Sequence, residues 1–449
     1  MYAAWELHHD ELPGELSGWL PQGDARTVSY CRCVQQRAGA FEIHIQENTM
    51  TTAAKRNRES LPVGDLGIIA LQSSKELGSK VNDYIVEWRS ERDHRHKALP
   101  QLEGYARDNY LIRTENPRFG SGEGKGIIYD SIRGEDLYIL IDVCNYSLTY
   151  KMRGKTNHMS PDDHFLDLER MISAIGGKAR RINIIMPYLY ESRQTGRNGR
   201  ESLDCAQALK DLVQMGVENI ITFDAHEPRI QNAIPLSGFE NFRPIYQFIK
   251  GLYRACPTFD VSPDRLLIVS PDEGGASRAI YMANVLGVDM GMFYKRRDYT
   301  TIVNGQHPIV AHEFLGADVA GKDVVIIDDM ISSGDGVIEI AKQLKKRKAE
   351  RIFICATFGL FTDGLEKFDK AYRKGLFNAI LTTNLTYQKP GLLEREWYQS
   401  CDLSKFIALI IDTLNHDGSL SELLNPVDRI NKFLAKKGVV RASDAETKV

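Results

Sequence analysis

The fold of this chain is decided by the stretch Val324-Val325-Ile326-Ile327-Asp328-Asp329-Met330-Ile331-Ser332-Ser333-Gly334-Asp335-Gly336. Its first four residues are branched and apolar, which is typical of a buried strand in a parallel sheet. Asp328 and Asp329 follow, and a turn of small residues then leads into a helix expected from 337 to 345. Two acids and several free backbone N–H groups thus meet at one point. Carboxylates can accept hydrogen bonds from ribose hydroxyls there, and the helix N-terminus can hold a phosphate. The stretch predicts a sugar-phosphate site. The alternative is a strand that ends in solvated acids before an ordinary turn.

The composition limits the class of protein. The chain has 449 residues, of which 43% are hydrophobic and 26% charged, so two globular domains are expected. A net charge of −3 argues against a general nucleic-acid binder. No apolar run is long enough to span a bilayer, and the start of the chain lacks the basic region and apolar core of a secretory signal. The seven cysteines are scattered without a zinc spacing, which indicates free thiols in a reducing cytoplasm.

The chain from residue 66 onward alternates between predicted strands and predicted helices. Strands are expected at 66–71, 136–141, 181–188, 219–224, 266–270, 290–294, 324–327 and 351–356. Helices are expected from 75, where Ser73 or Ser74 can cap, from 161, where Ser160 can cap, and at 202–215, 277–286, 337–345 and 420–434. Such alternation is typical of parallel sheets flanked by helices. Two successive sets predict two α/β domains with a cleft between them.

Two further strand ends carry groups suited to binding. One strand leads into Ser270-Pro271-Asp272-Glu273-Gly274-Gly275. The glycines there allow close backbone approach, and Asp272 is expected to point into the crevice at the carboxyl edge of the sheet. Another strand ends in Phe223-Asp224-Ala225-His226-Glu227. A loop aspartate or a lone histidine at a strand end is commonly structural. Asp272 and His226 are therefore candidates for binding because the acid pair is predicted at the same edge.

The quoted stretch resembles the phosphoribosyl diphosphate loop of the type I phosphoribosyltransferase fold. From about Leu66 to about Leu424, the chain resembles one branch of that fold, the ribose-phosphate pyrophosphokinases. The resemblance implies two consecutive phosphoribosyltransferase-like domains with parallel sheets flanked by helices, at 61–238 and 239–417. A helix at 418–436 is expected to pack back on the first domain, and a tail follows at 437–449. Residues 1–60 are expected to be a disordered, dispensable extension, with a regulatory arm as the alternative.

The resemblance implies that ribose 5-phosphate binds at the acid pair and the turn after it. The residues implied are Asp272, Asp328, Asp329, Ser332, Ser333, Gly334 and Gly336. The family usually shows Asp-Thr-x-Gly-Thr after Asp-Asp-Met-x, so the turn departs from the pattern here. Asp335 would repel a bound phosphate if it faced inward, and it is therefore expected to face outward.

The resemblance also implies an ATP site. The residues implied are Phe119, Ser121, Glu123, Arg193, Gln194 and His226. Phe119 offers a stacking face and Glu123 an acceptor for an adenine amino group, both across a subunit interface. Thr195 replaces the aspartate usual after Arg-Gln, which departs from the family pattern. The implied cofactor is Mg²⁺, at His226 and Asp272, because hard oxygen ligands dominate such sites.

Lys295 and Arg297 match two catalytic residues of the family, next to a stretch at 299–312 that is expected to be flexible. Their charges suit a transition state in which negative charge spreads over a diphosphoryl group. The implied reaction transfers the diphosphoryl group of ATP to the 1-hydroxyl of ribose 5-phosphate. The implied protein is a cytoplasmic homo-oligomer, a hexamer by resemblance, without nucleic-acid or membrane partners. Two alternatives are a phosphoribosyltransferase that consumes the diphosphate and a non-catalytic regulatory relative.

Overall fold

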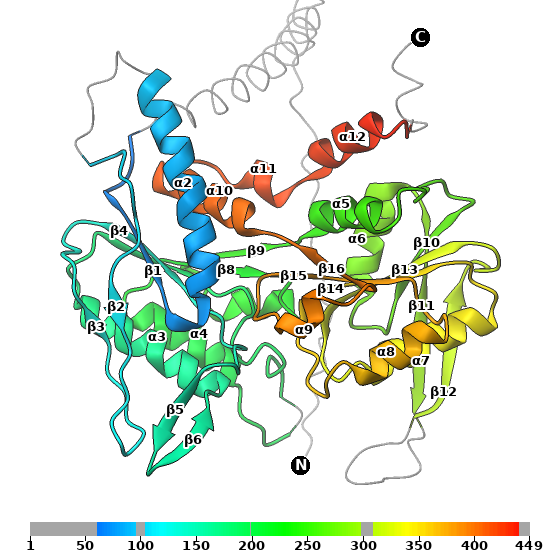
Figure 1. Cartoon of the computed structure of the whole chain (residues 1–449), viewed down its shortest axis with the longest axis horizontal. Helices are drawn as coiled ribbons and strands as arrows, with labels where there is room; N and C mark the ends of the chain where they lie inside the picture. Colours follow the sequence, from blue (N-terminus) through cyan, green and yellow to red (C-terminus); the bar gives the residue numbers. More distant parts are fainter. Residues whose placement is uncertain (1–60, 96–103, 198, 298–308, 440–449) are drawn as a thin grey trace, which may run out of the picture. The chain divides into compact units, whose positions relative to one another are not determined.

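The computed structural model describes residues 61–95, 104–197, 199–297 and 309–439 (Figure 1). The extension predicted at 1–60, residues 299–308 of the stretch predicted to be flexible, and residues 440–449 of the tail lie outside the described residues. None of the helices in the described part is long and apolar enough to cross a membrane.

The first domain contains a five-stranded parallel sheet. Its order is β1-β4-β7-β8-β9, with bounds Leu66–Ala70, Asp136–Leu140, Arg181–Ile185, Asn219–Phe223 and Gly238–Phe242. The accompanying helices are η1 (Gln72–Ser74), α2 (Lys75–Arg95), α3 (Pro161–Ile175), α4 (Asp204–Gln214) and η2 (Pro228–Ala233). Two short hairpins add β2 (Thr114–Glu115) with β3 (Ile127–Ile128), and β5 (Thr149–Met152) with β6 (Lys155–His158). In Figure 1, α3 and α4 are seen below the strands of this sheet.

The second domain contains a seven-stranded sheet. Its order is β12-β11-β10-β13-β14-β15-β16, with bounds Ile309–Gly316, Asp289–Arg297, Leu266–Ser270, Asp323–Ile331, Ile352–Gly359, Ala379–Thr383 and Tyr398–Cys401. Only the pairing of β11 with β12 is antiparallel in this sheet of the described chain. Its helices are α5 (Ile245–Ala255), α6 (Ala276–Leu286), α7 (Asp335–Lys346), α8 (Glu366–Arg373) and α9 (Pro390–Leu393). The chain ends in α10 (Ser404–Asn415), α11 (Ser421–Leu424) and α12 (Val427–Lys436).

The central strands are apolar runs because they are covered on both faces. Every residue of β4 and β14 is buried, and so are the first five residues of β13. Parallel strands covered by helices on both sides need no polar face, so their sequences are continuous rather than alternating. The predicted α/β class with two parallel sheets is therefore confirmed.

Local signals place the ends of α3 as the sequence predicts. Ser160 Oγ accepts from the backbone N–H of Asp163, and the Asp163 carboxylate accepts from the Ser160 N–H, which together form a capping box. At the other end, Gly176 has a φ of 56°, a left-handed conformation that glycine adopts without strain. Helix α2 begins at Lys75 as predicted, but the cap predicted for it was wrong. Ser73 and Ser74 belong to η1, and Ser73 Oγ accepts instead from the N–H of Asp142.

Two predicted boundaries also differ from the structure. Strand β9 pairs with β8, so residues 239–242, assigned from the sequence to the second domain, belong to the first sheet. Only Phe242 is fully buried in β9, which left a weak strand signal. Strand β11 continues to Arg297 and pairs with β12 from Ile309, so part of the stretch expected to be flexible is extended strand.

The predicted helix at 420–434 is divided into α11 and α12. Pro426 separates them, since proline lacks the N–H that continues a helix. α11 packs against β9, α12 packs against α5, and it is the earlier helix α10 that packs on α2. The return of the chain to the first domain therefore begins before residue 418.

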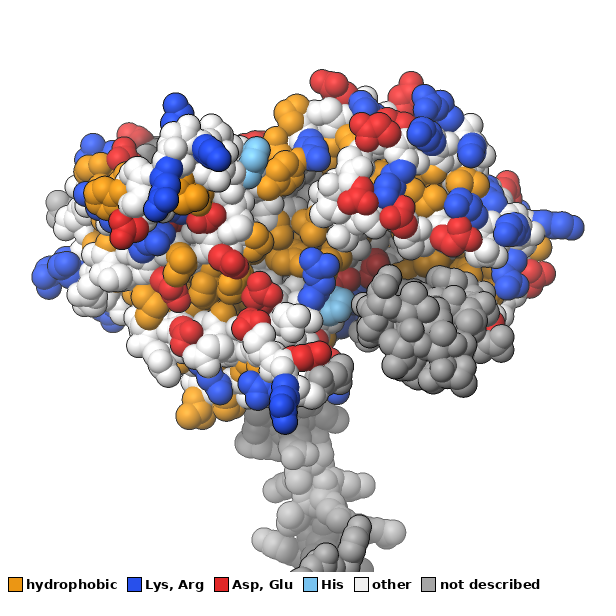
Figure 2. Space-filling model, turned by 90° about the horizontal axis from the view of Figure 1, so that it is seen from below, with side chains coloured by type: hydrophobic (Ala, Val, Ile, Leu, Met, Phe, Trp, Pro, Cys, Tyr) orange, Lys and Arg blue, Asp and Glu red, His pale blue; other side chains and the backbone are white. Residues whose placement is uncertain are grey.

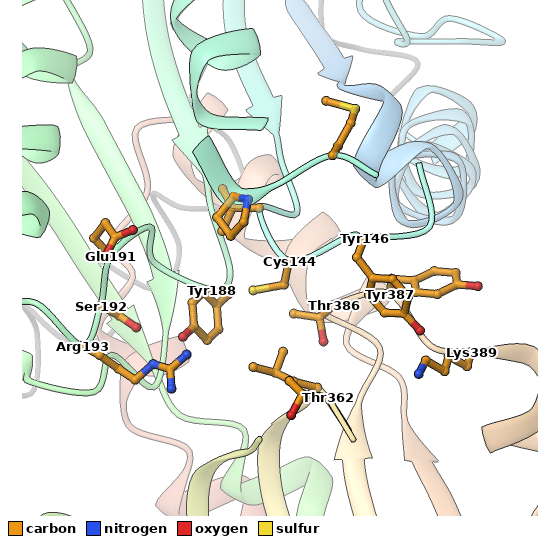
Figure 3. A pocket seen from close by; sticks show the side chains of 14 residues that line it. Cys144, Tyr146, Tyr188, Glu191, Ser192, Arg193, Thr362, Thr386, Tyr387 and Lys389 are labelled. Carbon is orange, nitrogen blue, oxygen red and sulfur yellow. The ribbon is translucent and has the colours of Figure 1, made fainter. Parts of the chain in front are cut away.

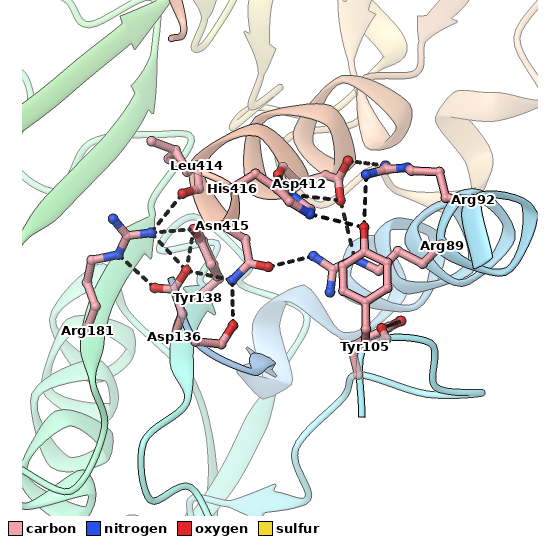
Figure 4. Close-up of polar contacts among 12 residues, drawn as sticks. Arg89, Arg92, Tyr105, Asp136, Tyr138, Arg181, Asp412, Leu414, Asn415 and His416 are labelled. Carbon is pink, nitrogen blue, oxygen red and sulfur yellow. Dashed lines mark hydrogen bonds and ion pairs between the residues drawn. The ribbon is translucent and has the colours of Figure 1, made fainter. Parts of the chain in front are cut away.

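A buried polar network fixes α10 to the first domain (Figure 4). Arg89 of α2 is 1% exposed and donates to Asp412 Oδ1 at 3.3 Å and to Asn415 Oδ1 at 2.7 Å. Asn415 Nδ2 donates to Asp136 Oδ2 at 2.9 Å. Arg181 in turn donates to both oxygens of Asp136, at 2.7 and 2.8 Å. Since buried charges are tolerated only when paired and hydrogen-bonded, this network sets the position of α10.

Asp412→Asn should destabilise the native state strongly, because it leaves the buried guanidinium of Arg89 without its counter-charge. Breaking a buried pair by removing one partner costs about 3–5 kcal/mol. Urea denaturation would measure the change in the free energy of unfolding. Glu76→Gln is the matched control, since it removes the exposed Glu76–Lys80 pair of α2 and should cost less than about 0.5 kcal/mol. Equal small losses in both variants would show that the network does not hold α10.

Candidate active site between the two sheets

The carboxyl ends of strands from both sheets meet at one place. His226 follows β8 of the first sheet, and Asp329 lies in β13 of the second. The Nδ1 atom of His226 is 2.6 Å from Asp329 Oδ2, so a hydrogen bond joins the two domains. Ligands of parallel α/β sheets bind outside the carboxyl ends of strands. The predicted acid pair and the predicted histidine are therefore brought together.

A buried arginine lies at the centre of this junction. Arg278 of α6 donates through Nε to Asp224 Oδ1 at 2.8 Å and through Nη2 to the carbonyl of Ala225 at 3.2 Å. Its Nη2 atom is also 3.7 Å from Asp329 Oδ2. Thr357 of β14 donates to the second oxygen of Asp224 at 2.8 Å. One guanidinium thus serves a carboxylate from each sheet.

The backbone of Asp224 is strained. Its φ of 44° lies in the left-handed region, which costs energy for a residue with a Cβ. The hydrogen bonds from Arg278 and Thr357 to its carboxylate hold it there. This geometry turns the chain sharply after β8 and directs the following His226 toward Asp329.

The two adjacent acids have opposite shifts in pKa. Burial and the neighbouring charge of Asp329 raise the pKa of Asp328 well above its ordinary value. Burial alone would raise the pKa of Asp329 as well, but the hydrogen bond from His226 and the charge of Arg278 outweigh it and lower that pKa. The bond to Asp329 also raises the pKa of His226. The two acids are therefore electrostatically unequal, as expected when like charges are close.

The turn after the acid pair is shaped by a glycine. Gly334 has a φ of 90° and precedes α7, and a Cβ added there would lie 2.0 Å from the ring of Phe368. The turn leads directly into the N-terminus of α7, next to Ser332 and Ser333 and with Gly336 in its first turn. Asp335 faces outward as expected, because its exposed carboxylate accepts from Lys367 Nζ at 2.7 Å.

Asp272 lies at the same site. Its side chain accepts from the N–H of Gly275 at 3.2 Å, and Ser270 Oγ donates to its backbone carbonyl at 2.6 Å. Its charge contributes to the raised pKa of both Asp328 and His226, which indicates its proximity to both.

The donor set around Asp272 suits Mg²⁺, although no ready-made cage of three or more ligands is formed by the residues that the structure describes. Mg²⁺ keeps several waters and binds through one or two carboxylates and substrate phosphates, so a full protein cage is not required. Because Asp329 holds Nδ1 of His226, Nε2 is the ring nitrogen left for a phosphate or a metal, as in carboxylate–histidine–metal arrangements.

A cavity of about 390 Å³ lies next to the acid-pair strand (Figure 3). Its lining residues follow strands of both sheets: Cys144 after β4, Tyr188 after β7, Leu360 after β14 and Thr386 after β15. Tyr188 Oη is 3.8 Å from Met330 Sδ, one residue beyond the acid pair. Figure 2 shows the molecule from below relative to Figure 1, and apolar side chains gather near the middle of that face with charged side chains of both signs around them.

The residues predicted for ATP fall into separate places. Arg193 lines the cavity, and Gln194 is exposed beside it. Phe119 is 55% exposed, and Ser121 Oγ donates to Glu123 Oε2 at 2.7 Å in the same surface turn. This turn also contacts the hairpin of β5 and β6, since the N–H of Arg153 donates to the carbonyl of Gly120 at 2.9 Å, and Lys125 Nζ lies 5.9 Å from the Phe119 ring centroid.

The two predicted catalytic cations lie at the end of β11. The backbone of Lys295 is in register with His312, and that of Arg297 with Ile309. Their side chains lie outside the described part of the chain.

Sequence reasoning missed Arg278 and gave Asp224 no role. A lone arginine in an amphipathic helix resembles a solvated side chain, and only the fold shows that it points inward. A usable signal was present: Arg278 comes directly after the glycine turn of Asp272, so α6 must start at the site. Asp142 was missed too, although it directly follows a buried strand.

Asp142 joins the domains at a second place. It is buried and accepts from the N–H of Cys144 at 2.9 Å and from the N–H of Tyr387, in the loop after β15, at 2.6 Å. Burial raises the pKa of Asp142 to about 7, against the lowering effect of these two N–H groups.

Two consecutive parallel-sheet domains, with an acid pair at a strand end before a helix N-terminus, define a protein of the type I phosphoribosyltransferase class. The family description "N-terminal domain of ribose phosphate pyrophosphokinase" matches residues 66–216, and "Phosphoribosyl transferase domain" matches residues 247–395. The chain belongs to the ribose-phosphate pyrophosphokinase family, as the motifs predicted.

Named relatives agree with this membership. The ribose-phosphate pyrophosphokinase of Vibrio cholerae is 28% identical over 337 residues, covering 73% of this chain and 97% of that protein. That of Ralstonia nicotianae is 30% identical over 250 residues, covering 55% of this chain and 70% of that protein. The crystal structure of phosphoribosylpyrophosphate synthetase from Mycobacterium smegmatis has the same fold, with a TM-score of 0.60 at 20% identity over 79% of this chain and 100% of that one.

The raised pKa of Asp142 should make the stability of the native state depend on pH. In the folded chain the pKa of Asp142 is about 7, whereas its ordinary value is 3.8. Between pH 3.8 and pH 7 the carboxyl group therefore binds more protons in the folded state than in the unfolded state. The free energy of unfolding then falls as the pH rises through this window, by at most about 1.4 kcal/mol per pH unit.

Asp142→Asn removes this contribution. Urea denaturation across the window should show that the stability of the unsubstituted chain, relative to that of the variant, declines toward neutral pH. Asp318→Asn is the control, since Asp318 is exposed and accepts from the nearby backbone N–H of Ala320. A difference that stays constant with pH would contradict the prediction.

Proposed function

We propose that this chain is a ribose-phosphate diphosphokinase. It transfers the diphosphoryl group of ATP to the 1-hydroxyl of ribose 5-phosphate and forms AMP and 5-phosphoribosyl 1-diphosphate for nucleotide biosynthesis. The observation that supports this best is the bond between His226 and Asp329. It joins a strand end of the first domain, expected to serve the nucleotide, to the acid-pair loop of the second, expected to serve the sugar.

Ribose 5-phosphate would bind at the acid-pair loop. The carboxylate of Asp329 accepts from ribose hydroxyls, and Asp328 can donate or accept according to its proton. The 5-phosphate lies against the N-terminus of α7, at Ser332, Ser333, Gly334 and Gly336, where free N–H groups and the helix dipole favour an anion. The outward direction of Asp335 keeps a negative charge away from that phosphate.

ATP would bind to the first domain with its phosphates toward His226 and Arg193 and its adenine toward Gln194. Phe119, Ser121 and Glu123 would complete the adenine pocket of a neighbouring chain, which explains the exposure of the Phe119 ring. The protein is then a homo-oligomer, a hexamer by resemblance. Mg²⁺, held at Asp272 and His226, would supply charge neutralisation at the phosphates. The described cysteines are free thiols, as suits the proposed cytoplasmic location.

The reaction needs positioning and charge stabilisation more than covalent help. The 1-oxygen of ribose 5-phosphate attacks the β-phosphorus of ATP and loses its proton as the new bond forms. The bond from the β-phosphorus to the oxygen of the α-phosphate breaks, and AMP leaves with that oxygen. Lys295 and Arg297 would stabilise the negative charge that spreads over the transferred group.

An assay of AMP release from ATP and ribose 5-phosphate tests this function. One AMP should form for each 5-phosphoribosyl 1-diphosphate, and none without the sugar phosphate. A phosphoribosyltransferase would release no AMP from this pair. It would also leave the matched N-terminal nucleotide domain without a role. A regulatory relative, which the altered turn after the acid pair would suit, would bind nucleotide without turnover.

Asp328→Asn and Asp329→Asn should each weaken ribose 5-phosphate binding, since the ribose hydroxyls lose a hydrogen bond to a carboxyl group of the acid pair. Each lost charge-assisted bond costs about 1.5–3 kcal/mol, roughly ten- to hundredfold in affinity. Calorimetry with ribose 5-phosphate alone measures this. ATP affinity should be unchanged in Asp328→Asn. Asp335→Asn, in the same loop but facing outward, is the control and should bind normally. Equal losses in all three variants would place the sugar elsewhere.

Lys295→Ala and Arg297→Ala should lower kcat while leaving KM almost unchanged, because groups that act mainly in the transition state do not hold the substrate. Loss of one such donor commonly costs on the order of 10²–10³ in kcat. Arg296→Ala, which removes the cation between the two residues that match the family's catalytic pair, is the control and should have a much smaller effect. If KM accounts for the whole loss, or if the three variants behave alike, these cations attract substrate and do not stabilise the transition state.

A further inference from the structure

The cavity beside the acid pair has one wall from each domain (Figure 3). The first domain contributes Tyr146, Tyr188 and Arg193, and the second contributes Tyr387 and Lys389 from the loop between β15 and α9. A volume of about 390 Å³ is within the range of sites for small molecules, roughly 300–1,000 Å³. None of the residues assigned above to ATP or to the sugar comes from that loop.

One tyrosine from each domain and a lysine of the second domain lie together at one side of the cavity. The rings of Tyr146 and Tyr387 meet edge to face, with centroids 5.7 Å apart and planes at 86°. Lys389 Nζ lies 4.9 Å from the centroid of the Tyr146 ring. An edge-to-face pair keeps ring faces available for a flat ligand, and a lysine that rests on a partly exposed ring can turn to a phosphate at little cost.

The loop is held rigidly although it connects two elements. Asp142 of the first domain accepts the Tyr387 N–H at 2.6 Å, and its own N–H is bound by Ser73 Oγ at 3.1 Å. On the other side, Gln388 Nε2 donates to the carbonyl of Thr383 at 3.2 Å and to Ser400 Oγ at 3.1 Å. A buried carboxyl group is costly unless it is hydrogen-bonded, and that of Asp142 uses one of its bonds to fix a loop of the other domain. Such support is what a precise binding site requires.

The lining suits a purine nucleotide. The walls are largely apolar and aromatic, which favours a flat base over a sugar. Arg193 and Lys389 place a cation on each wall for phosphates. Glu191 and Thr386 add polar groups that can meet an amino group of the base. Glu191 has a φ of 53°, and strain of this kind at a cavity wall is typical of functional positions.

We propose that the loop 384–389 is an ATP-binding element, in which Tyr387 packs on the base and Lys389 binds a phosphate, and that Asp142 acts as a positioning residue by fixing this loop across the domain junction. The inference rests on the proposed function for the identity of the nucleotide. It adds a second-domain contact, within one chain, to a site otherwise assigned to the first domain and to a neighbouring chain.

Equilibrium dialysis with ATP in the absence of ribose 5-phosphate tests the element without turnover. Lys389→Ala and Tyr387→Leu should each weaken ATP binding, by about threefold to tenfold for a partly exposed contact. Tyr387→Leu keeps the backbone N–H that Asp142 binds. Lys405→Ala is the matched control, because Lys405 also rests on aromatic rings, 5.6 Å from Tyr84 and 5.8 Å from Trp88, but does not line the cavity. Unchanged ATP affinity in both test variants would overturn the proposal.

Asp142→Asn tests the positioning role. It should raise KM for ATP and leave KM for ribose 5-phosphate unchanged. Its effect on ATP binding should be smaller in the background of Tyr387→Leu, because both substitutions act through the loop 384–389. A purely structural role would weaken both substrates alike, or would be additive with Tyr387→Leu, and either result would overturn it. Dialysis measures ATP binding without turnover, whereas the AMP-release assay measures the reaction. This inference and the proposed function can therefore fail independently.

Discussion

Arg278, buried on α6, lies between a carboxylate of each sheet, Asp224 after β8 and Asp329 in β13. Two buried acids from different domains would repel one another and resist burial, and a guanidinium with several fixed donors offsets both effects. Its bonds hold Asp224 in a left-handed conformation, and that conformation directs His226 to Asp329. The closeness of the two strand edges, on which the shared site depends, therefore follows from this one cation.

The consequence is a site that neither domain possesses alone. The second domain supplies the acid-pair loop, where burial raises the pKa of Asp328, whereas the hydrogen bond from His226 and the charge of Arg278 lower that of Asp329. In the proposed function, the first domain supplies His226 and Arg193 for the nucleotide. A diphosphokinase must hold two substrates in line at close range, and joining two phosphoribosyltransferase-like domains at their carboxyl edges provides this arrangement.

Features set by local sequence were predicted well, and features set by distant contacts were not. The strand at Val324–Ile327 and the cap at Ser160 depend on near neighbours, so apolar runs and capping residues indicated them. Arg278 and Asp142 act on partners far along the chain, and their own segments do not identify those partners. The division between α11 and α12 was missed although Pro426 marks it, because the helical period continues across the break.

A double-mutant cycle between Asp224 and Arg278 tests most directly whether the Arg278 guanidinium holds the two halves of the site together. Asp224→Asn, Arg278→Met and the double variant would be compared by urea denaturation and by calorimetric binding of ribose 5-phosphate. If Arg278 and Asp224 act as a unit, the double variant should lose clearly less than the sum of the single variants, with an interaction free energy of at least about 1.5 kcal/mol in the unfolding measurement. Ribose 5-phosphate affinity should follow the same pattern, because the position of Asp329 depends on the same cation. Additive losses in both measurements would contradict the account.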